Sequence, residues 1–301
     1  MTTVVALGGN ALLRGGERGT AAEQLAHLHE TAAALRPLLG EPIAITHGNG
    51  PQVGNVLLRQ ERAADEVPQL PLSLAVAQTQ AEIGSLAAVA LGPVSPRPVA
   101  CLLTHVVVEH DDPSFARPSK PIGPFYDSGT ASRLRKERGW PLVEEQGRGW
   151  RRTVSSPAPV EIVELESIST LLAAGTSVIA CGGGGIPVLR RADGSLGGVD
   201  AVIDKDRASA LLAQALGASH LVILSDVDAV LRGFGTPDAE PIAELTAAEA
   251  KALAADQPAG SMRPKLEAAA AFAAGGGDVL ITSADALERA LDGAAGTRVG
   301  G

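Results

Sequence analysis

Short runs of apolar and β-branched residues alternate along the chain with longer stretches in which apolar residues recur at helical spacing. Most of the short runs are followed by glycine-rich or polar residues, a combination typical of a strand that ends in a turn. The predicted strands are residues 4–7, 42–46, 99–104, 106–108, 160–163, 177–181, 221–224 and 278–281. Because helical stretches separate many of them, these strands are expected to pair in parallel through right-handed crossovers. The pattern predicts an α/β fold, a three-layer αβα sandwich with a mostly parallel central sheet.

Two of the helical stretches begin with a capping box. Thr20 and Glu23, and again Thr246 and Glu249, have the spacing at which the side chain of each residue can accept a hydrogen bond from the backbone of the other. A further helix start is expected within residues 260–265, where glycine, serine and proline stand together. The remaining predicted helices are one that follows Gly54 and runs to about residue 64, and residues 72–91, 166–174, 206–216 and 284–291.

Residues 111–155 break the alternation of strands and helices. The segment holds five prolines and five of the seven aromatic residues of the chain. Long irregular segments inside compact domains are usually functional or disordered, and five aromatic side chains can form a small core of their own. We therefore predict an ordered lid subdomain that protrudes from a single domain spanning residues 1–301.

Composition and charge exclude several classes of protein. Apolar residues make up 45% of the 301 positions, which is enough for a large core and excludes a disordered or fibrous chain. The net charge of −9 has the wrong sign for a predominantly electrostatic nucleic-acid binder. No uninterrupted apolar stretch approaches 18 residues and the N-terminus has no basic segment, so we expect a cytoplasmic protein without a membrane partner. Cys101 and Cys181 are predicted to be buried thiols rather than a disulfide.

Three glycine-rich segments follow predicted strands. They are Gly8-Gly9-Asn10, Gly48-Asn49-Gly50 and Gly182-Gly183-Gly184-Gly185. The turns after parallel strands meet at one edge of the sheet, where open α/β proteins bind ligands. Glycines let backbone N–H groups approach an anion, and helix N-termini favour negative charge. One such segment is as easily an ordinary tight turn, but three together predict a phosphate-handling cleft.

Better-known phosphate and catalytic motifs do not fit. The P-loop pattern Gly-x-x-x-x-Gly-Lys-Ser/Thr is absent. Residues 48–54 resemble a dinucleotide-binding turn, but no second strand ending in an acidic residue follows at the required distance. The spacing of the histidines does not match a zinc site. The Gly-x-Ser-x-Gly motif of the α/β hydrolases is absent. Cys181 belongs to no motif that would supply a catalytic partner for a nucleophilic cysteine.

The chain uses twenty arginines but only five lysines. Lys120, Lys205 and Lys265 lie in unusual settings rich in glycine, proline or aspartate, whereas Lys136 and Lys251 lie in ordinary surface sequence. Each unusual lysine taken alone is about as easily a solvated surface group. Together they indicate that a compact ammonium group is needed, which the planar guanidinium of arginine would not replace.

These lysines suggest a mechanism of phosphoryl transfer, which depends mainly on positioning and on neutralising charge. Lysines and Mg²⁺ between two anions would suffice, and an acceptor that is already an anion needs no general base. Asp204 and Asp206 flank Lys205 and are expected to hold it, to touch Mg²⁺ through water, or simply to cap a helix. The hypothesis requires the amines of Lys205 and Lys265 to converge beside the glycine turns.

Several motifs together resemble those of the carbamate kinases, within the amino acid kinase superfamily, over nearly the whole chain. The segments that carry the resemblance are residues 6–12, 46–54, 120–126, 179–187, 202–206 and 260–265. The segment Lys-Pro-Ile-Gly-Pro-Phe-Tyr at residues 120–126, with its protruding subdomain, distinguishes carbamate kinases from acetylglutamate, glutamate and UMP kinases.

The resemblance implies reversible phosphoryl transfer from ATP to carbamate, giving ADP and carbamoyl phosphate, in a Mg²⁺-dependent homodimer. It implies an acceptor part at about residues 1–200 and a nucleotide part at about 201–301, with the protruding subdomain at about 111–155. Mg²⁺ would be bound mainly through the ATP phosphates, without protein ligands. The implied catalytic residues are Lys120, Lys205, Lys265 and Asp204. The implied carbamate and phosphoryl site is Gly8, Gly9, Asn10, Gly48, Asn49 and Gly50. The implied nucleotide residues are Gly182, Gly183, Gly184, Gly185, Asp206, Asp226, Ser261 and Met262.

Three positions depart from the family pattern: Thr2-Thr3 replaces a basic residue, His105 a glutamine, and Arg263 a smaller residue. Two other functions stay open. One is a different amino acid kinase, such as an acetylglutamate-like enzyme, and the other is a catalytically silent nucleotide-binding regulator.

Overall fold

The computed structural model describes residues 2–145, 147–236, 238–257 and 262–301. Its helices are α1 (Ala21–Ala34), α2 (Gly50–Arg62), α3 (Leu72–Leu91), α4 (Ser128–Arg138), α5 (Leu165–Ala173), α6 (Lys205–Ala215), α7 (Ala247–Asp256), α8 (Met262–Ala274) and α9 (Leu287–Leu291). Its main strands are β1 (Thr3–Leu7), β2 (Ile43–His47), β3 (Val99–Cys101), β9 (Ser177–Ile179), β12 (His220–Ser225), β15 (Glu244–Thr246), β16 (Asp278–Ser283) and β17 (Thr297–Gly300).

These strands form one sheet in the order β15-β17-β16-β12-β1-β2-β9-β3. All neighbouring strands pair in parallel except β16 and β17. Side chains alternate along β1, so that Val4 and Ala6 belong to one core cluster while Val5 and Leu7 belong to the other. Both faces of the sheet are therefore buried, as expected for parallel strands covered by helices.

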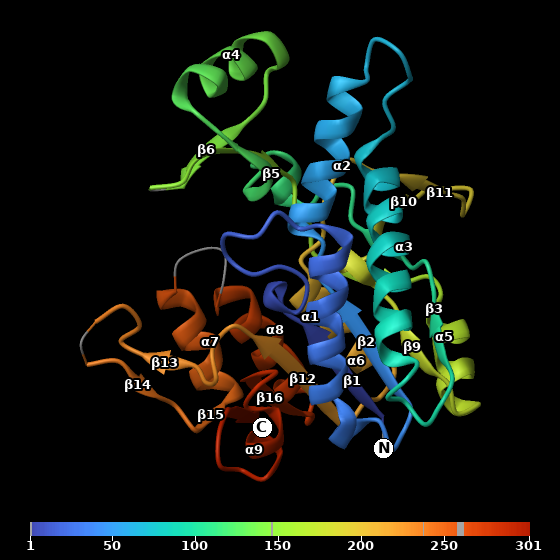
Figure 1. Ribbon diagram of the computed structural model, residues 1–301, viewed down its shortest axis with the longest axis vertical. Coiled ribbons are helices and arrows are strands. Elements are labelled where there is room, and N and C mark those ends of the chain that lie inside the picture. Colours follow the sequence, from blue (N-terminus) through green and yellow to red (C-terminus); the bar gives the residue numbers. More distant parts are fainter. Residues whose placement is uncertain (1, 146, 237, 258–261) are drawn as a thin grey trace.

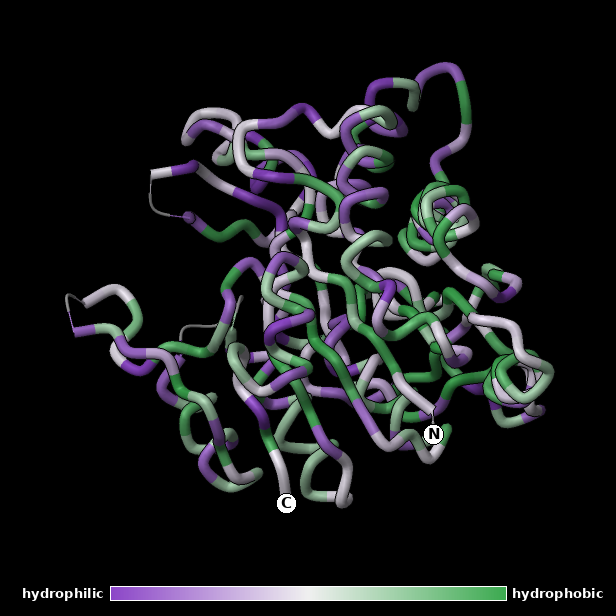
Figure 2. The backbone as a smooth tube through the Cα atoms, turned by 60° about the horizontal axis from the view of Figure 1, so that its bottom comes forward, coloured by the Kyte–Doolittle hydropathy of each residue, from purple (hydrophilic) through white to green (hydrophobic). Residues whose placement is uncertain are grey.

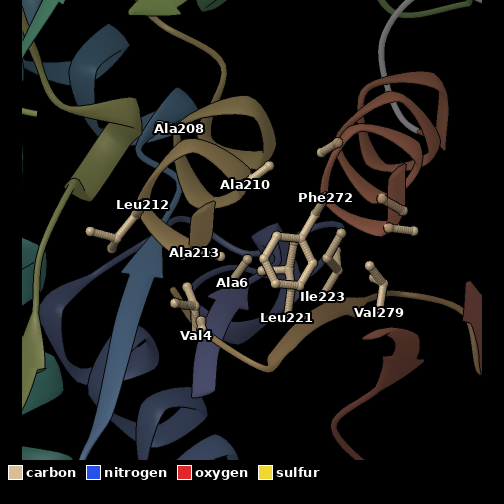
Figure 3. Packing of buried hydrophobic residues seen from close by; sticks show 14 of the residues in the cluster. Val4, Ala6, Ala208, Ala210, Leu212, Ala213, Leu221, Ile223, Phe272 and Val279 are labelled. Carbon is tan, nitrogen blue, oxygen red and sulfur yellow. The ribbon is translucent and has the colours of Figure 1, made fainter. Parts of the chain in front are cut away.

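Helices α1, α3 and α9 cover one face of the sheet, and α5, α6, α7 and α8 cover the other (Figure 1). Phe272 of α8 packs between the strand residues Leu221 and Ile223 and the small side chains of α6 (Figure 3). Hydrophobic residues are concentrated in the central layer of the molecule (Figure 2). The structure confirms the predicted αβα sandwich with its mostly parallel central sheet.

Helix α3 is the one described helix that is long and apolar enough to cross a membrane. In this fold it is an interior element, because Ile83 and Ala87 are buried in the cluster that also contains Leu28 of α1. Its polar residues Thr79 and Gln80 are also buried and make hydrogen bonds inside the protein.

A second sheet lies beside the first, with the order β11-β10-β4-β8. It contains β4 (His105–Val108), β8 (Pro159–Ile162), β10 (Ile186–Arg190) and β11 (Leu196–Gly198). The sequence pattern predicted neither β10 nor β11.

The predicted strand 99–104 ends early, at Cys101, because the side chain of Gln80 bonds both the N–H and the C=O of Thr104. The prediction that Cys101 is buried was wrong, since it lies exposed at the end of edge strand β3.

The described residues of the segment 111–155, which are all of it except residue 146, form a lobe above the main sheet (Figure 1). It contains a three-stranded antiparallel sheet of β5 (Lys120–Tyr126), β7 (Gly149–Val154) and β6 (Leu142–Glu145), together with α4. Its aromatic rings are covered by guanidinium groups, with Arg135 lying 4.3 Å from the ring centre of Trp150 and Arg152 4.4 Å from that of Trp140. These contacts explain why aromatic and basic residues gather in this segment.

Candidate active site

The glycine-rich turns lie at the same edge of the central sheet. The strands β1, β2 and β9 are adjacent and parallel, so the turns that follow them meet at their carboxyl ends. The end of β12, which carries Ser225 and Asp226, lies next to the end of β1. The prediction that the glycine turns gather along one edge is confirmed.

Lys205 and Lys265 converge on the carboxylate of Asp206. The Nζ of Lys205 lies 2.6 Å from Oδ1 of Asp206, and the Nζ of Lys265 lies 3.3 Å from Oδ2. Lys205 stands at the start of α6, and Lys265 lies in the first turn of α8. A Cβ added to Gly48 would meet the Cδ of Lys205 at 3.6 Å, so this lysine extends along the turn after β2. The expected convergence of the two amines beside a glycine turn is confirmed.

Lys120 reaches the same region from the lobe. Its Nζ donates to Oδ2 of Asp204 at 3.1 Å and to the carbonyl oxygen of Ile203 at 3.2 Å. Asp204 also caps α6, because its Oδ1 accepts a hydrogen bond from the N–H of Asp206 at 2.9 Å. Both expected roles of Asp204, as a partner for a lysine and as a helix cap, are present. Three ammonium groups thus lie around two adjacent aspartates.

The electrostatics of this cluster follow from its burial and its alternating charges. Burial by itself would raise the pKa of Asp204, but the ammonium groups of Lys120 and Lys205 hold that pKa well below its usual range. Burial lowers the pKa of Lys205, and the carboxylate of Asp206 only partly compensates. For Lys265 burial also opposes the charge, yet the attraction of Asp206 prevails and raises its pKa. The carboxylate of Asp206 therefore offsets the cost of burying an ammonium group fully for Lys265 and partly for Lys205.

The turn after β1 approaches a neighbouring strand closely. A Cβ on Gly8 would lie 2.5 Å from the carbonyl oxygen of Leu224 at the end of β12, so only glycine fits there. Gly9 and Asn10, which follow in a short 3₁₀ turn, are exposed at the same edge. Both therefore lie where a ligand can reach their backbone.

The turn after β2 leads directly into α2, which begins at Gly50 with Pro51 in its first turn. The first N–H groups of such a helix have no partner inside it and favour an anion. The side chain of Asn49 is buried and donates to Oγ1 of Thr79 at 2.8 Å. Asn49 therefore fixes the turn against α3 through its side-chain amide group.

Residues Gly182 to Gly185 are all buried and pack against protein atoms. An added Cβ would lie 2.6 Å from Cε1 of His47 at Gly182, 2.5 Å from Cγ of Asn49 at Gly183, and 2.7 Å from the carbonyl carbon of Ile203 at Gly184. These glycines bring the turn after β9 into close contact with the turn after β2 and with the residues that precede α6. Their contact with a nucleotide stays a prediction.

Two of the other nucleotide residues implied by the resemblance, Asp226 and Met262, are described by the structure and lie on β12's end and on α8. Asp226 is exposed at the end of β12, and its negative charge contributes to the raised pKa of Lys265. Met262 begins α8 and packs against the core beneath it. Ser261 lies outside the described residues.

The sequence analysis missed His47, which is buried directly beneath the site. Its Nδ1 lies 2.9 Å from the carbonyl oxygen of Gly48, and burial together with the nearby charge of Lys205 lowers its pKa to about 4. A neutral His47 donates its Nδ1–H to that carbonyl and holds the turn in place. The signal that could have found it is its position at the end of a buried strand, immediately before the glycine turn.

Cys181 has the one positive φ among the described non-glycine residues, 50°. Its N–H donates to Oγ1 of Thr104 at 3.0 Å, which holds this strained conformation. The thiol is fully buried and burial raises its pKa, so it is a poor nucleophile, in agreement with its predicted place in the core.

Two positions that depart from the family pattern contact carboxylates through their side chains. Nδ1 of His105 lies 2.7 Å from Oε1 of Glu164. Nε of Arg263 lies 2.9 Å from Oε1 of Glu267, whose other oxygen accepts from Arg207 of α6 at 2.8 Å. Arg263 thus takes part in a link between α6 and α8, the two helices that carry Lys205 and Lys265.

Metal-binding side chains do not gather within the described part of the chain, where no group of three or more His, Cys, Asp or Glu residues could hold an ion. The carboxylates at the site, Asp204 and Asp206, are already bound by lysines. These residues could therefore hold a divalent cation that is already bound to phosphate groups. The carboxylates of Asp204 and Asp206 would contact such an ion through water.

The fold and this site define a phosphotransferase of the amino acid kinase class. Residues 1–283 match the amino acid kinase family. The carbamate kinase of Halobacterium salinarum is 47% identical over 99% of this chain and 97% of its own, and that of Thermococcus kodakarensis is 42% identical over 98% of both. The structure of carbamate kinase from Giardia lamblia bound to AMP-PNP has a TM-score of 0.90 at 38% identity, covering 99% of this chain and 98% of that one.

The chain belongs to the carbamate kinases of the amino acid kinase family. It is therefore an enzyme, an ATP-dependent phosphotransferase.

Proposed function

We propose that this enzyme transfers a phosphoryl group reversibly between ATP and carbamate, giving ADP and carbamoyl phosphate. The observation that carries the proposal is the cluster in which Lys205 and Lys265 share the carboxylate of Asp206 beside the turn after β2, while Lys120 reaches in from the lobe. Carbamate as the acceptor rests on the similarity to carbamate kinases at 40–47% identity.

The acceptor and the phosphoryl group lie, in this proposal, over the turns after β1 and β2. Backbone N–H groups of Gly8, Gly9 and Asn10 face them from one side, and those of Gly48, Asn49 and Gly50 from the other. Carbamate is a small planar anion that needs no proton removed before it attacks phosphorus. Backbone amides and helix N-termini suffice to bind it, so no general base takes part.

The nucleotide lies over the C-terminal part of the sheet, at residues 201–301, with the acceptor on the part formed by residues 1–200. Lys205 and Lys265 contact the ATP phosphates, and Asp226 and Met262 lie toward the nucleoside. Asp204 and Asp206 hold the lysines in place before the substrate arrives. Such preorganised charge stabilises the transferring group without reorganisation during the reaction.

Lys120 contacts the transferring phosphoryl group from the lobe, at residues 111–155. When substrate is absent, its ammonium group is neutralised by Asp204. Binding of a phosphate group competes with Asp204 for Lys120 and draws the lysine into the site. A Mg²⁺ ion bound to the nucleotide would neutralise charge on its phosphates.

The test is ATP formation from ADP and carbamoyl phosphate in the presence of Mg²⁺. We expect ATP from the unaltered enzyme and a loss of at least about 100-fold in kcat for Lys205→Ala and for Lys265→Ala, since each removes a charge that stabilises the transition state. Lys251→Ala, at an exposed lysine of α7, is the matched control and should retain full activity.

Other outcomes would point elsewhere. Phosphorylation of an N-acyl amino acid without ATP formation from carbamoyl phosphate would favour a different amino acid kinase. Nucleotide binding without turnover of either substrate would favour a silent regulator.

The resemblance further leads us to propose a cytoplasmic homodimer. Light scattering combined with size-exclusion chromatography tests the dimer, for which we expect a mass of twice the 30.5 kDa chain.

A further inference from the structure

Helix α2 and strand β5 approach each other at two glycines. A Cβ added to Gly54 of α2 would lie far inside van der Waals contact of the Cα of Gly123, 2.6 Å from its N and 3.1 Å from its carbonyl carbon. The obstacle on the β5 side is backbone, which cannot turn aside as a flexible side chain can. Glycine inside a helix is less favourable than alanine by about 1 kcal/mol. The close approach of β5 explains why α2 nevertheless has a glycine at position 54.

Gly123 has a different requirement. Its φ of +78° lies in the left-handed region, and the register of β5 against β7 shifts between Ile122 and Tyr126, around this residue. Its carbonyl oxygen accepts a hydrogen bond from Nε of Arg151 at 3.1 Å. The bend in β5 at Gly123 is therefore fixed from the lobe side, and it places the strand directly against Gly54.

Side chains on both sides of this contact are anchored. Ile122 is buried in a core cluster with Val53 and Val56, the residues that flank the glycine on α2. Lys120 is two residues before Ile122 on the same strand, and its Nζ donates to Asp204. The distance between α2 and β5 therefore decides how far Lys120 reaches toward Asp204 and the glycine turns.

We propose that Gly54 is a positioning residue for Lys120: its missing side chain lets β5 seat against α2 so that the ammonium group of the lobe reaches the site. The inference rests on the proposed function for its effect on turnover, but the position of Lys120 can be measured without it. Gly54 itself touches no substrate and acts only through β5.

The test is Gly54→Ala. The added methyl group must push β5 away by about 1 Å, because carbon atoms do not approach closer than about 3.5 Å. Lys120 then leaves Asp204, and its amine becomes more reactive. We expect acetylation of Lys120 by sulfo-N-hydroxysuccinimide acetate, measured by mass spectrometry relative to Lys251, to become at least fivefold faster. Lys205 and Lys265 should stay as protected as in the unaltered enzyme.

Turnover supplies a second measurement. In Gly54→Ala, kcat for ATP formation should fall by about tenfold to 100-fold, since misplacement of a catalytic group by about 1 Å has effects of this size. The KM for ADP should change by less than twofold, because Lys205 and Lys265 lie on α6 and α8 and are held by Asp206 rather than by a residue of β5. A general structural defect would instead raise the acetylation rates of Lys120, Lys205 and Lys265 together and would change both kcat and the KM for ADP.

The matched control is Gly40→Ala, the same change at a position where a Cβ meets nothing within 4 Å. It should leave Lys120 acetylation and kcat unchanged. If Gly54→Ala does not fold, Leu58→Ala replaces it. Leu58 lines the same space as Ile122 and Gly123, so shortening it loosens the packing of β5 on α2 without adding atoms. That variant should also accelerate acetylation of Lys120.

Lys120 acetylation at the unaltered rate, in a folded Gly54→Ala or in Leu58→Ala, would overturn the proposal. An unchanged kcat in Gly54→Ala would do the same if the unaltered enzyme is active. If the unaltered enzyme makes no ATP, the proposed function fails, while the acetylation rates still decide whether Gly54 positions Lys120.

Discussion

At the scale of single residues, the site contains two aspartates that flank Lys205 but bind different lysines. Asp206 is almost fully buried and binds Lys205 and Lys265, whereas Asp204 binds Lys120 and caps α6. The sequence analysis expected both aspartates to hold Lys205, and the resemblance placed Asp204 with the catalytic residues and Asp206 with the nucleotide. Alternation of charge along residues 204–206 indicated an ion-pair cluster, but only the position of α8 decides which carboxylate meets Lys265.

His47 allows a prediction of how stability depends on pH. Its pKa is about 4 in the folded protein and 6.5 in an ordinary environment, so the unfolded chain binds a proton at a pH where the folded protein does not. The stabilising effect of a neutral His47 is complete above pH 6.5 and is lost as the pH falls toward 4. The loss is about 3 kcal/mol, from 1.36 kcal/mol per pKa unit.

In His47→Gln this part of the pH dependence should be absent. Urea unfolding at pH 7, 5.5 and 4.5 measures it, with the unaltered protein losing more free energy of unfolding than the variant over that range. His110→Gln, at an exposed histidine, is the control and should follow the unaltered protein. Parallel pH curves for His47→Gln and the unaltered protein would contradict the assignment.

At the scale of elements, local sequence fixed several helix boundaries well. Both predicted capping boxes are present, with Thr20 and Glu23 opening α1 and Thr246 and Glu249 opening α7. The predicted helix 72–91 agrees with α3 at both ends. These boundaries depend on hydrogen bonds between residues three apart, or on an apolar run that stops at a glycine or proline, and so can be predicted from the sequence alone.

The link between α6 and α8 is a prediction at this scale. Glu267 accepts hydrogen bonds from Arg207 of α6 and from Arg263 of its own helix, all on partly exposed side chains. We expect Glu267→Gln to lower the free energy of unfolding by only about 1 kcal/mol, since exposed ion pairs contribute little. The KM for ADP should rise severalfold, because the spacing of α6 and α8 sets the separation of Lys205 and Lys265.

The comparison variant for this link is Glu288→Gln, an exposed carboxylate on α9. It should change neither the KM for ADP nor the free energy of unfolding. The effect of Glu267→Gln should shrink at 1 M salt, because screening weakens exposed ion pairs. An unchanged KM for ADP at low salt would show that the bridge does not govern the nucleotide lysines.

At the scale of the whole molecule, the lobe and the sheet have separate cores. Ala131 and Leu134 of α4 are buried within the lobe, and none of the described residues from 127 to 148 belongs to the three core clusters of the protein. Tyr126 and Trp150 are paired across β5 and β7, so the chain leaves and re-enters the hairpin at adjacent positions. The outer part of the lobe is thus an addition to a hairpin that the main body already holds through Ile122.

Replacing residues 127–148 with a short glycine-rich turn tests this division. The temperature of unfolding should stay within about 5 °C of the unaltered protein, because the replaced residues add nothing to the three core clusters. Lys120 should remain protected from acetylation, since Ile122 still anchors β5. A fall of more than about 10 °C in that temperature would show that the lobe and the body fold as one unit.

By itself, the sequence determined the class of fold, the helix caps, the glycine turns at one sheet edge and the three lysines that the structure brings together. These features depend on local periodicity, on hydrogen bonds between near neighbours and on the carboxyl ends that parallel strands share. Tertiary structure decided which carboxylate meets which lysine, that Gly182 to Gly185 pack beneath His47 and Asn49, and that Gly54 faces Gly123. Such contacts join residues far apart in the chain, and their partners follow only from how helices and lobe are placed in space.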